Sequence, residues 1–198
     1  MDGQGAEAGW LGEVRARLAR PRPEAVPRVE WPGDEPLRPA SVLIPLYVRE
    51  KALHLLLTRR TETVEHHKGQ ISFPGGAAEA GDADAWATAL RETEEEIGVP
   101  AVAVRRLGDL RRVLTATGFE VSPFVGAIPW PVALVPEVEE VAEILEIPLA
   151  WLLDPRSAGE RVVTWEGREV RTPVYLWRDH VVWGATARII GDLAAALR

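Results

Sequence analysis

The 198-residue chain contains no cysteine, and it has no long apolar run. Without cysteine, disulfide bonds, thiol catalysis and thiolate zinc sites are excluded, and an intracellular location is favoured. No apolar run approaches the roughly 20 residues that a membrane-spanning helix needs. The opening stretch "MDGQGAEAGWLGEVRARLAR" also lacks the basic start and apolar core of a signal peptide. We therefore expect a cytoplasmic protein with no membrane partner.

Positive charge is also scarce, because the net charge is -7 and the pI is about 5.2. This balance argues against a nucleic-acid partner, which requires a basic face. An anionic substrate would need a metal ion or a few focused basic residues. Hydrophobic residues make up 46% of the chain, which is long enough for one well-packed domain.

The first part of the chain differs from the rest. Leu11, Val14 and Leu18 have helical spacing, and the proline-rich stretch "PRPEAVPRVEWPGDEPLRPA" that follows is unsuited to a helix or a central strand. We therefore assign residues 1–40 to an N-terminal helix with an extended lead-in, and residues 41–198 to one domain.

After the lead-in, short apolar runs alternate with turns. The first two runs flank a charged turn at Glu50 and Lys51, which predicts a hairpin. A helix is expected between Asp82, as its N-cap, and Gly98, just past its end. Because hairpins connect many strands, the α/β content predicts a mixed β-sheet. Further strands are expected within 104–115, 119–128, 136–154, 161–170 and 174–184, before a closing helix at 185–198.

The stretch "LRETEEEIG" places four glutamates within five residues, beside Arg91. On a helix, Glu92, Glu95 and Glu96 share one face, where like charges repel unless a cation lies among them. Two interpretations follow from the residues alone. The segment is either a solvated acidic face or a site that holds a metal ion.

The preceding "FPGG" favours the second interpretation. Paired glycines allow the backbone to approach a ligand closely, so a carbonyl group there can join the carboxylates as a metal ligand. Ligation by oxygen alone suits Mg²⁺ or Mn²⁺, and the helix has no His or Cys at zinc-like spacing.

These residues resemble the Nudix hydrolase box: Gly, five residues, Glu, seven residues, Arg-Glu, an apolar residue, any residue, Glu-Glu, any residue, Gly and an apolar residue. Residues 91–99 match its second half, with Thr93 in the apolar position. In the first half, Gly76 is followed at the expected spacing by Asp82 instead of Glu. Eight residues, one more than usual, then precede Arg91.

This expansion resembles the coenzyme A (CoA) pyrophosphatase branch of the family, which carries a second signature upstream. "TGFEVSPFVG" and "WGATAR" also resemble this branch. Two positions depart from the signature, since Thr61 replaces Ser or Ala and Glu65 replaces an arginine. The matching positions are Leu56-Leu57-Thr58, Arg60, Gly69 and Phe73-Pro74-Gly75-Gly76.

The resemblance implies a Nudix-type α/β/α sandwich with a mixed β-sheet and a loop-helix-loop catalytic motif. It implies Mg²⁺ or Mn²⁺ as cofactor, held by Glu92, Glu95, Glu96 and the Gly76 carbonyl. Glu95, Arg91 and Glu92 are the expected catalytic residues, with Arg91 holding a neighbouring carboxylate in position. Glu95 is the first choice for the general base, and Glu120 is the alternative. The expected substrate-binding residues are Arg59, Arg60, Lys68, Gly69, Phe73 and Gly75.

The implied reaction is hydrolysis of the pyrophosphate bond of CoA or acyl-CoA, giving 3',5'-ADP and (acyl-)4'-phosphopantetheine. One alternative keeps the enzyme but changes the substrate to ADP-ribose, NADH or another nucleoside diphosphate derivative, as Glu65 suggests. Another is a domain that senses nucleotide without hydrolysis, although a pure binder has no need of the whole acidic face. Because some members of the family pair as dimers, a homodimer is an open alternative.

Overall fold

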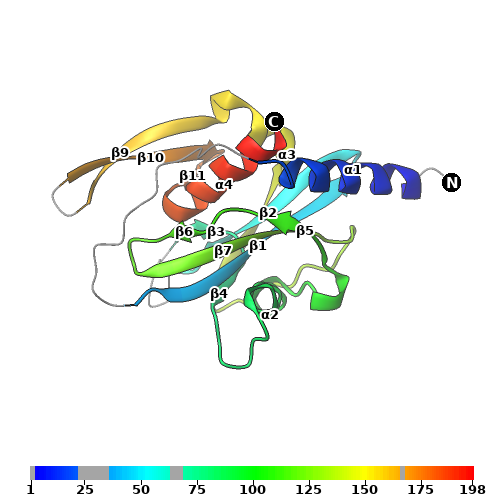
Figure 1. The fold of residues 1–198 in the computed structure, drawn as a ribbon, viewed down its shortest axis with the longest axis horizontal. Coiled ribbons are helices and arrows are strands. Elements are labelled where there is room, and N and C mark those ends of the chain that lie inside the picture. Colours follow the sequence, from blue (N-terminus) through cyan, green and yellow to red (C-terminus); the bar gives the residue numbers. More distant parts are fainter. Residues whose placement is uncertain (1–2, 22–35, 63–68, 166–167) are drawn as a thin grey trace.

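The computed structural model describes residues 3–21, 36–62, 69–165 and 168–198. These residues form a large mixed β-sheet, a smaller sheet and helices on both faces of the large sheet (Figure 1). The large sheet contains β1 (Arg38–Arg49), β2 (Ala52–Arg60), β3 (Ile71–Ser72), β4 (Gly75–Ala77), β5 (Arg105–Asp109), β6 (Val113–Leu114), β7 (Phe119–Ala127) and β8 (Val141–Pro148). The smaller sheet contains β9 (Ala158–Trp165), β10 (Arg168–Trp177) and β11 (His180–Val182).

The hairpin at the start of the large sheet is confirmed. Arg49 of β1 pairs with Ala52 of β2, and the turn residues Glu50 and Lys51 both take positive φ angles, 52° and 65°. Strand β1 pairs in parallel with β7, whereas the other described strand pairs are antiparallel. The prediction of a mixed sheet is therefore correct.

Helices lie on both faces of the large sheet. Helix α2 (Ala85–Ile97) covers the lower face in Figure 1, whereas α1 (Gly3–Leu18), α3 (Leu149–Leu153) and α4 (Gly184–Leu197) lie above it. Within the described part of the chain, no helix is both long and apolar enough to cross a lipid bilayer.

The N-terminal helix belongs to the main hydrophobic core. Its spaced residues Leu11, Val14 and Leu18 are buried in the same cluster as Ile190 of α4 and Leu107 of β5. This confirms the helical prediction for that stretch. The division of the chain at residue 40 stays a prediction.

The C-terminal hairpins form as expected, but they build a separate sheet. Strand β10 pairs with β9 on one side and β11 on the other. Tyr175 and Val182, which pair across these strands, are buried against the core, whereas their neighbours Leu176 and Val181 are exposed. Alternation along the strands thus packs one face of the small sheet onto α4.

Candidate active site

The acidic helix α2 begins two residues later than its sequence predicts. Its N-cap is Asp84, not Asp82, because the Asp84 side chain accepts a hydrogen bond from the Ala87 amide at 2.8 Å. The other end agrees with the prediction, since Gly98 takes a left-handed conformation with φ 72° and its amide donates to the Glu94 carbonyl.

Asp82 instead pairs with Arg91. The Arg91 Nε donates to Asp82 Oδ1 at 3.0 Å and Nη2 donates to Oδ2 at 3.2 Å. The Asp82 side chain is only 7% exposed, and the Arg91 guanidinium holds the pKa of its carboxyl below the ordinary value. This fork-shaped pairing fixes the guanidinium beside the first turns of the helix.

Arg91 also gathers two of the expected metal ligands. Its guanidinium lies 3.0 Å from Glu92 Oε1 and 2.9 Å from Glu95 Oε2, and Nη2 donates to the Ala77 carbonyl at 3.1 Å. One planar group therefore contacts the helix, strand β4 and the loop between them.

The two glycines of β4 make room for this helix. A Cβ atom on Gly76 would lie 2.5 Å from the Glu92 carboxylate, and one on Gly75, where φ is 150°, would lie 2.2 Å from the Ser41 carbonyl. Only glycine fits at Gly75, where the clash is with backbone, whereas a side chain at Gly76 would displace the Glu92 carboxylate. Gly76 and Glu92, both expected metal ligands, are thus in direct contact.

Glu96 is the most buried carboxylate of the helix, with 4% of its surface exposed. Burial raises its pKa to about 8, and Glu92 and Glu140 add to the rise, whereas Arg60 and the Gly75 amide oppose it. The Arg60 Nη1 lies 3.5 Å from Glu96 Oε1, and the buried Oε2 atom has no hydrogen-bond partner among the described residues. Burial also raises the pKa of Glu92.

Glu140 also belongs to this cluster, although it is not among the metal ligands expected from the sequence. Its carboxylate lies 3.3 Å from Arg60 Nη2, and its charge raises the pKa of both Glu92 and Glu96. The acidic stretch around Glu140 resembles a solvated edge in the sequence. The pairing of β8 with β2, which begins at Val141 opposite Arg60, and the hydrogen bond from the Thr61 amide to the Glu140 carbonyl, at 2.8 Å, bring it beside β2.

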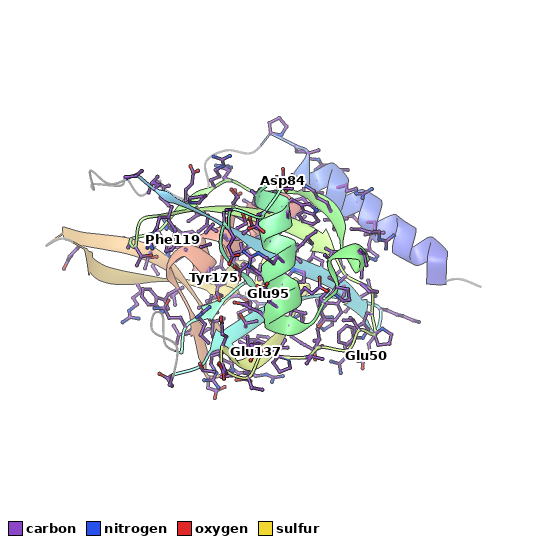
Figure 2. The ribbon with its side chains drawn as sticks, turned by 90° about the horizontal axis from the view of Figure 1, so that it is seen from below. Glu50, Asp84, Glu95, Phe119, Glu137 and Tyr175 are labelled. Atoms are coloured by element: carbon purple, nitrogen blue, oxygen red, sulfur yellow. The ribbon has the colours of Figure 1, made fainter. Side chains whose placement is uncertain are left out.

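The segment before Glu140 also fixes the end of the helix. The amides of Val135 and Glu137 donate to the Ile97 and Glu96 carbonyls at 3.0 and 2.9 Å. These carbonyls have no partner within the helix. Figure 2 shows Glu137 beside the C-terminal end of α2 and Asp84 at its other end.

Two predicted substrate-binding residues lie away from the acidic cluster. Arg59 pairs with Glu143 at 3.2 Å, and Glu143 in turn lies 3.7 Å from His180 of β11, on the face opposite α2. Phe73 is 1% exposed within the main core, which leaves no surface for a ligand. Arg59 therefore lies on the other face of the sheet and Phe73 lies in the main core, so neither side chain contacts the acidic cluster.

Of the remaining expected residues, Gly69 and Glu120 lie in the described part of the chain. Gly69 takes a positive φ of 63°, and a Cβ atom there would lie 2.5 Å from Glu62 Oε1. Lys68 and Glu65 lie outside the described residues. Glu120 pairs with Arg112 at 2.9 Å and lies opposite Leu114 of β6, so its part as an alternative base stays a hypothesis.

Comparison with known proteins decides the family. The NUDIX domain model matches residues 37–163. The chain is 41% identical over 157 residues to the uncharacterized Nudix hydrolase NudL of Photorhabdus laumondii, covering 79% of this chain and 83% of that protein. It is 37% identical over 180 residues to the NudL of Yersinia pestis, covering 91% and 90%. The chain belongs to the Nudix family.

Solved structures agree on the Nudix fold. A MutT/nudix family protein from Enterococcus faecalis superposes with a TM-score of 0.51 at 18% identity, covering 83% of this chain and 63% of that one. The Nudix hydrolase RenU of M. smegmatis gives 0.50 at 20% identity, covering 61% and 76%. The expected fold class is therefore confirmed, and the protein is a Nudix hydrolase for nucleoside diphosphate derivatives.

Nudix hydrolases generally use divalent metal ions. No group of three or more His, Asp or Glu side chains in the described ranges is already arranged around one ion. The ion pairs explain this, because Arg91 draws Glu92 and Glu95 while Arg60 faces Glu96.

The residues still suit such an ion. The donors are oxygen atoms, as Mg²⁺ and Mn²⁺ prefer, and the unpartnered Glu96 Oε2 has a vacant acceptor position. The Glu95 side chain is 58% exposed and can turn toward the cluster.

A departure from the Nudix box also has a local explanation. Thr93 occupies the position where the box has an apolar residue, and it is fully buried. Its hydroxyl donates to the Ala89 carbonyl at 2.6 Å, one turn earlier in the helix. This bond satisfies the hydroxyl internally, so the position tolerates threonine.

Proposed function

We propose that this Nudix hydrolase cleaves the pyrophosphate bond of CoA or acyl-CoA, releasing 3',5'-ADP and (acyl-)4'-phosphopantetheine. The observation that carries the proposal is the signature from Leu56 to Gly76. Its Arg60 lies beside Glu96, and its Gly75 and Gly76 lie against Ser41 and Glu92. The signature therefore borders the acidic helix directly.

Some residues of the signature support the fold, and others are proposed to contact the substrate. Leu56, Leu57 and Thr58 are buried and anchor β2 in the sheet. Arg60 follows them at the end of the strand, with its guanidinium directed to the acidic cluster. Gly69 and Gly75 supply backbone that approaches a ligand without side-chain obstruction. We assign Arg60, Gly69 and Gly75, with Lys68, to substrate binding.

In the proposed mechanism, Glu95 is the general base. Its carboxylate is exposed and held by Arg91 at 2.9 Å, so it can accept a proton from the attacking water at a fixed position. Arg91, anchored by Asp82, keeps Glu92 and Glu95 aligned on the same side of the helix. Arg60 donates hydrogen bonds to the diphosphate as negative charge develops on the departing phosphate.

We assign Glu92, Glu95, Glu96 and the Gly76 carbonyl as the metal ligands. A bound Mg²⁺ or Mn²⁺ ion would neutralise the diphosphate and lower the pKa of the attacking water. The buried Glu96 then serves as the most firmly placed ligand, because its surroundings leave it little freedom to move.

A second substrate class rests on Glu65. Glu65 replaces the arginine that the signature has at this position. Loss of this positive charge favours a substrate with fewer phosphate groups, such as ADP-ribose or NADH. A nucleotide sensor without hydrolysis is the remaining alternative.

Product analysis tests the proposal. The protein is incubated with Mg²⁺ or Mn²⁺ and CoA, acetyl-CoA, dephospho-CoA, ADP-ribose or NADH, and the products are identified by chromatography with mass detection. We expect the CoA substrates to be cleaved best. Preference for ADP-ribose or NADH would overturn the substrate, and binding without cleavage of any compound would favour the sensor.

A further inference from the structure

Two arginines from distant parts of the chain hold one turn. The Arg188 guanidinium, on the second turn of α4, donates to the Leu114 carbonyl at the end of β6. The Arg38 guanidinium, at the start of β1, donates to the Thr117 carbonyl at 3.2 Å and lies 4.0 Å above the Phe119 ring. The turn between β6 and β7 therefore carries two positive charges.

The two motifs "TGFEVSPFVG" and "WGATAR" meet at this turn. The first motif begins at Thr117 and the second ends at Arg188. Neither motif contributes a residue to the acidic cluster on α2, and Glu120, the alternative base, is the one residue of the two motifs to which the sequence assigns a part in hydrolysis. Arg188 reaches Leu114, three residues before the first motif begins, so both motifs lie at this end of the sheet.

In the part of the chain that the structure describes, no carboxylate balances the charges of these two arginines. Among the described residues, neither guanidinium forms an ion pair, and the carboxylate beside the turn, Glu120, is already paired with Arg112. Burial lowers the pKa of Arg188, and no carboxylate opposes this effect in the described part of the chain. A partly buried arginine normally has a carboxylate or phosphate partner, because its charge is costly to remove from water.

The strand register places this turn within reach of the hydrolytic site. Val113 of β6 pairs with Val121 of β7, which pairs with Ala40 of β1, which pairs with Ala77 of β4. Three steps between neighbouring strands span about 14 Å. Ala77 is the residue whose carbonyl accepts from Arg91, so the turn lies across one end of the sheet from the acidic helix.

Helices α4 and α2 lie on opposite faces of the sheet near that end (Figure 1). Figure 1 shows the start of α4 above β6, with β4 and α2 below it. Phe119 lies to the side of α2 in Figure 2. A nucleotide that contacts both α2 and the two arginines would extend around the strand ends.

We propose that Arg188 and Arg38 form a subsite for a phosphomonoester on the nucleotide end of the substrate, separate from the diphosphate. The inference rests on the proposed function, since CoA carries such a group as its 3'-phosphate. Two guanidinium groups bind a dianionic phosphate through charge-assisted hydrogen bonds, and the hydrogen bonds to the turn hold them in place. The subsite supplies the cation that the signature lacks at Glu65.

Binding of two nucleotides that differ in one phosphate tests the subsite. The affinities of the full-length protein for 3',5'-ADP and 5'-AMP are measured by calorimetry with Mg²⁺ present. We expect 3',5'-ADP to bind about tenfold more tightly or better, and Arg188→Gln to remove most of this preference. Arg38→Gln, at an exposed position, should reduce it in the same direction.

Two control variants separate the subsite from general effects. Arg178→Gln removes one positive charge at the β10–β11 turn, and Thr186→Val removes the hydrogen bond from α4 to the Ile71 carbonyl. Both should keep the preference for 3',5'-ADP. Equal affinity of the wild-type protein for the two nucleotides would overturn the subsite, even if Arg188→Gln does not fold.

Cleavage assays then separate this inference from the proposed function. The ratio of kcat/KM for CoA to that for dephospho-CoA should fall in Arg188→Gln. Cleavage of both compounds with an unchanged ratio would overturn the subsite and leave the function standing. Arg188-dependent binding of 3',5'-ADP without any cleavage of CoA would support the subsite and overturn the proposed function. Arg188-dependent binding of inorganic phosphate as tight as that of 3',5'-ADP would overturn the assignment to substrate.

Discussion

Arg59 and Arg60 are neighbours in β2, yet they belong to two different regions of the molecule. Arg60 faces α2, where it lies between the carboxylates of Glu96 and Glu140, and its buried Nε has no hydrogen-bond partner among the described residues. Arg59 faces the small sheet, where it forms an ordinary, partly exposed ion pair with Glu143. Alternation along a strand is enough to separate them.

The difference shows on which face the fold gathers carboxylates. On the α2 face, carboxylates are gathered and partly buried, and their pKa values rise because the charges repel and lose water. On the other face, the layer is mostly apolar side chains packed under α4. Carboxylates with raised pKa values that are gathered in one cluster are typical of a functional site.

Of the substitutions that test this difference between the two faces, Glu95→Gln should have the largest effect on activity. It removes a proposed base and ligand charge at an exposed position, so turnover of CoA should fall about 10²- to 10⁴-fold with little change in melting temperature. Steady-state kinetics with Mg²⁺ measure the loss. The control is Glu94→Gln, since Glu94 points away and accepts from the Ala101 amide. Unchanged turnover in Glu95→Gln would remove this residue from the mechanism.

Replacing Arg91 with Lys should have the next largest effect. Lysine keeps the charge but cannot contact Asp82 through a planar fork while also holding Glu92 and Glu95. Misplacement of these carboxylates should reduce kcat about 10²-fold. Arg106→Lys, at the exposed pair with Asp109, is the matched control. Equal activity of the two variants would contradict the positioning role of Arg91.

The pair Arg60→Gln and Arg59→Gln sharpens the comparison directly. Loss of Arg60 leaves the buried Glu96 without its nearest cation, so both stability and kcat/KM should fall. Loss of Arg59 removes a partly exposed ion pair, which contributes only about 0–1 kcal/mol. Thermal unfolding and kinetics of the two variants should therefore differ clearly. A larger defect in Arg59→Gln would reverse our assignment of the faces.

The last prediction concerns pH. The folded-state pKa of Glu96, about 8, lies above its ordinary value of 4.5, so the folded protein binds the extra proton between these values. In metal-free protein, the contribution of Glu96 to stability should be complete below pH 4.5 and lost as the pH rises to about 8. Melting temperatures in the presence of a chelator measure this slope. Glu96→Gln should flatten it, and parallel curves for the two proteins would contradict the prediction.

Local patterns predicted most of the fold. The turn at Glu50 and Lys51, the spacing of Leu11, Val14 and Leu18, and the glycine after α2 each carry their own signal, and each is confirmed. The N-cap was misplaced by two residues because Asp82 and Asp84 have similar side chains. Arg91 distinguishes them, because its guanidinium pairs with the Asp82 carboxylate, whereas the Asp84 carboxylate caps the helix.

The site was harder to predict where its members come from separate elements. The box fixes the spacing of Glu92, Glu95 and Glu96 on one helix, and the glycines next to them follow from the same motif. Glu140, in contrast, joins the cluster through pairing of its backbone with Thr61. Phe73 and Arg59 match or adjoin the signature, but burial and strand alternation direct them elsewhere.

By itself, the sequence determined the family, the acidic helix and the mixed sheet, because these depend on residue types at short, regular spacing. Only the tertiary structure decided which charges meet. Burial raises the pKa of Glu96, one planar guanidinium gathers three carboxylates, and two arginines from distant parts of the chain donate to carbonyls of one turn. Contacts of this kind arise from packing between distant segments, which no local pattern records.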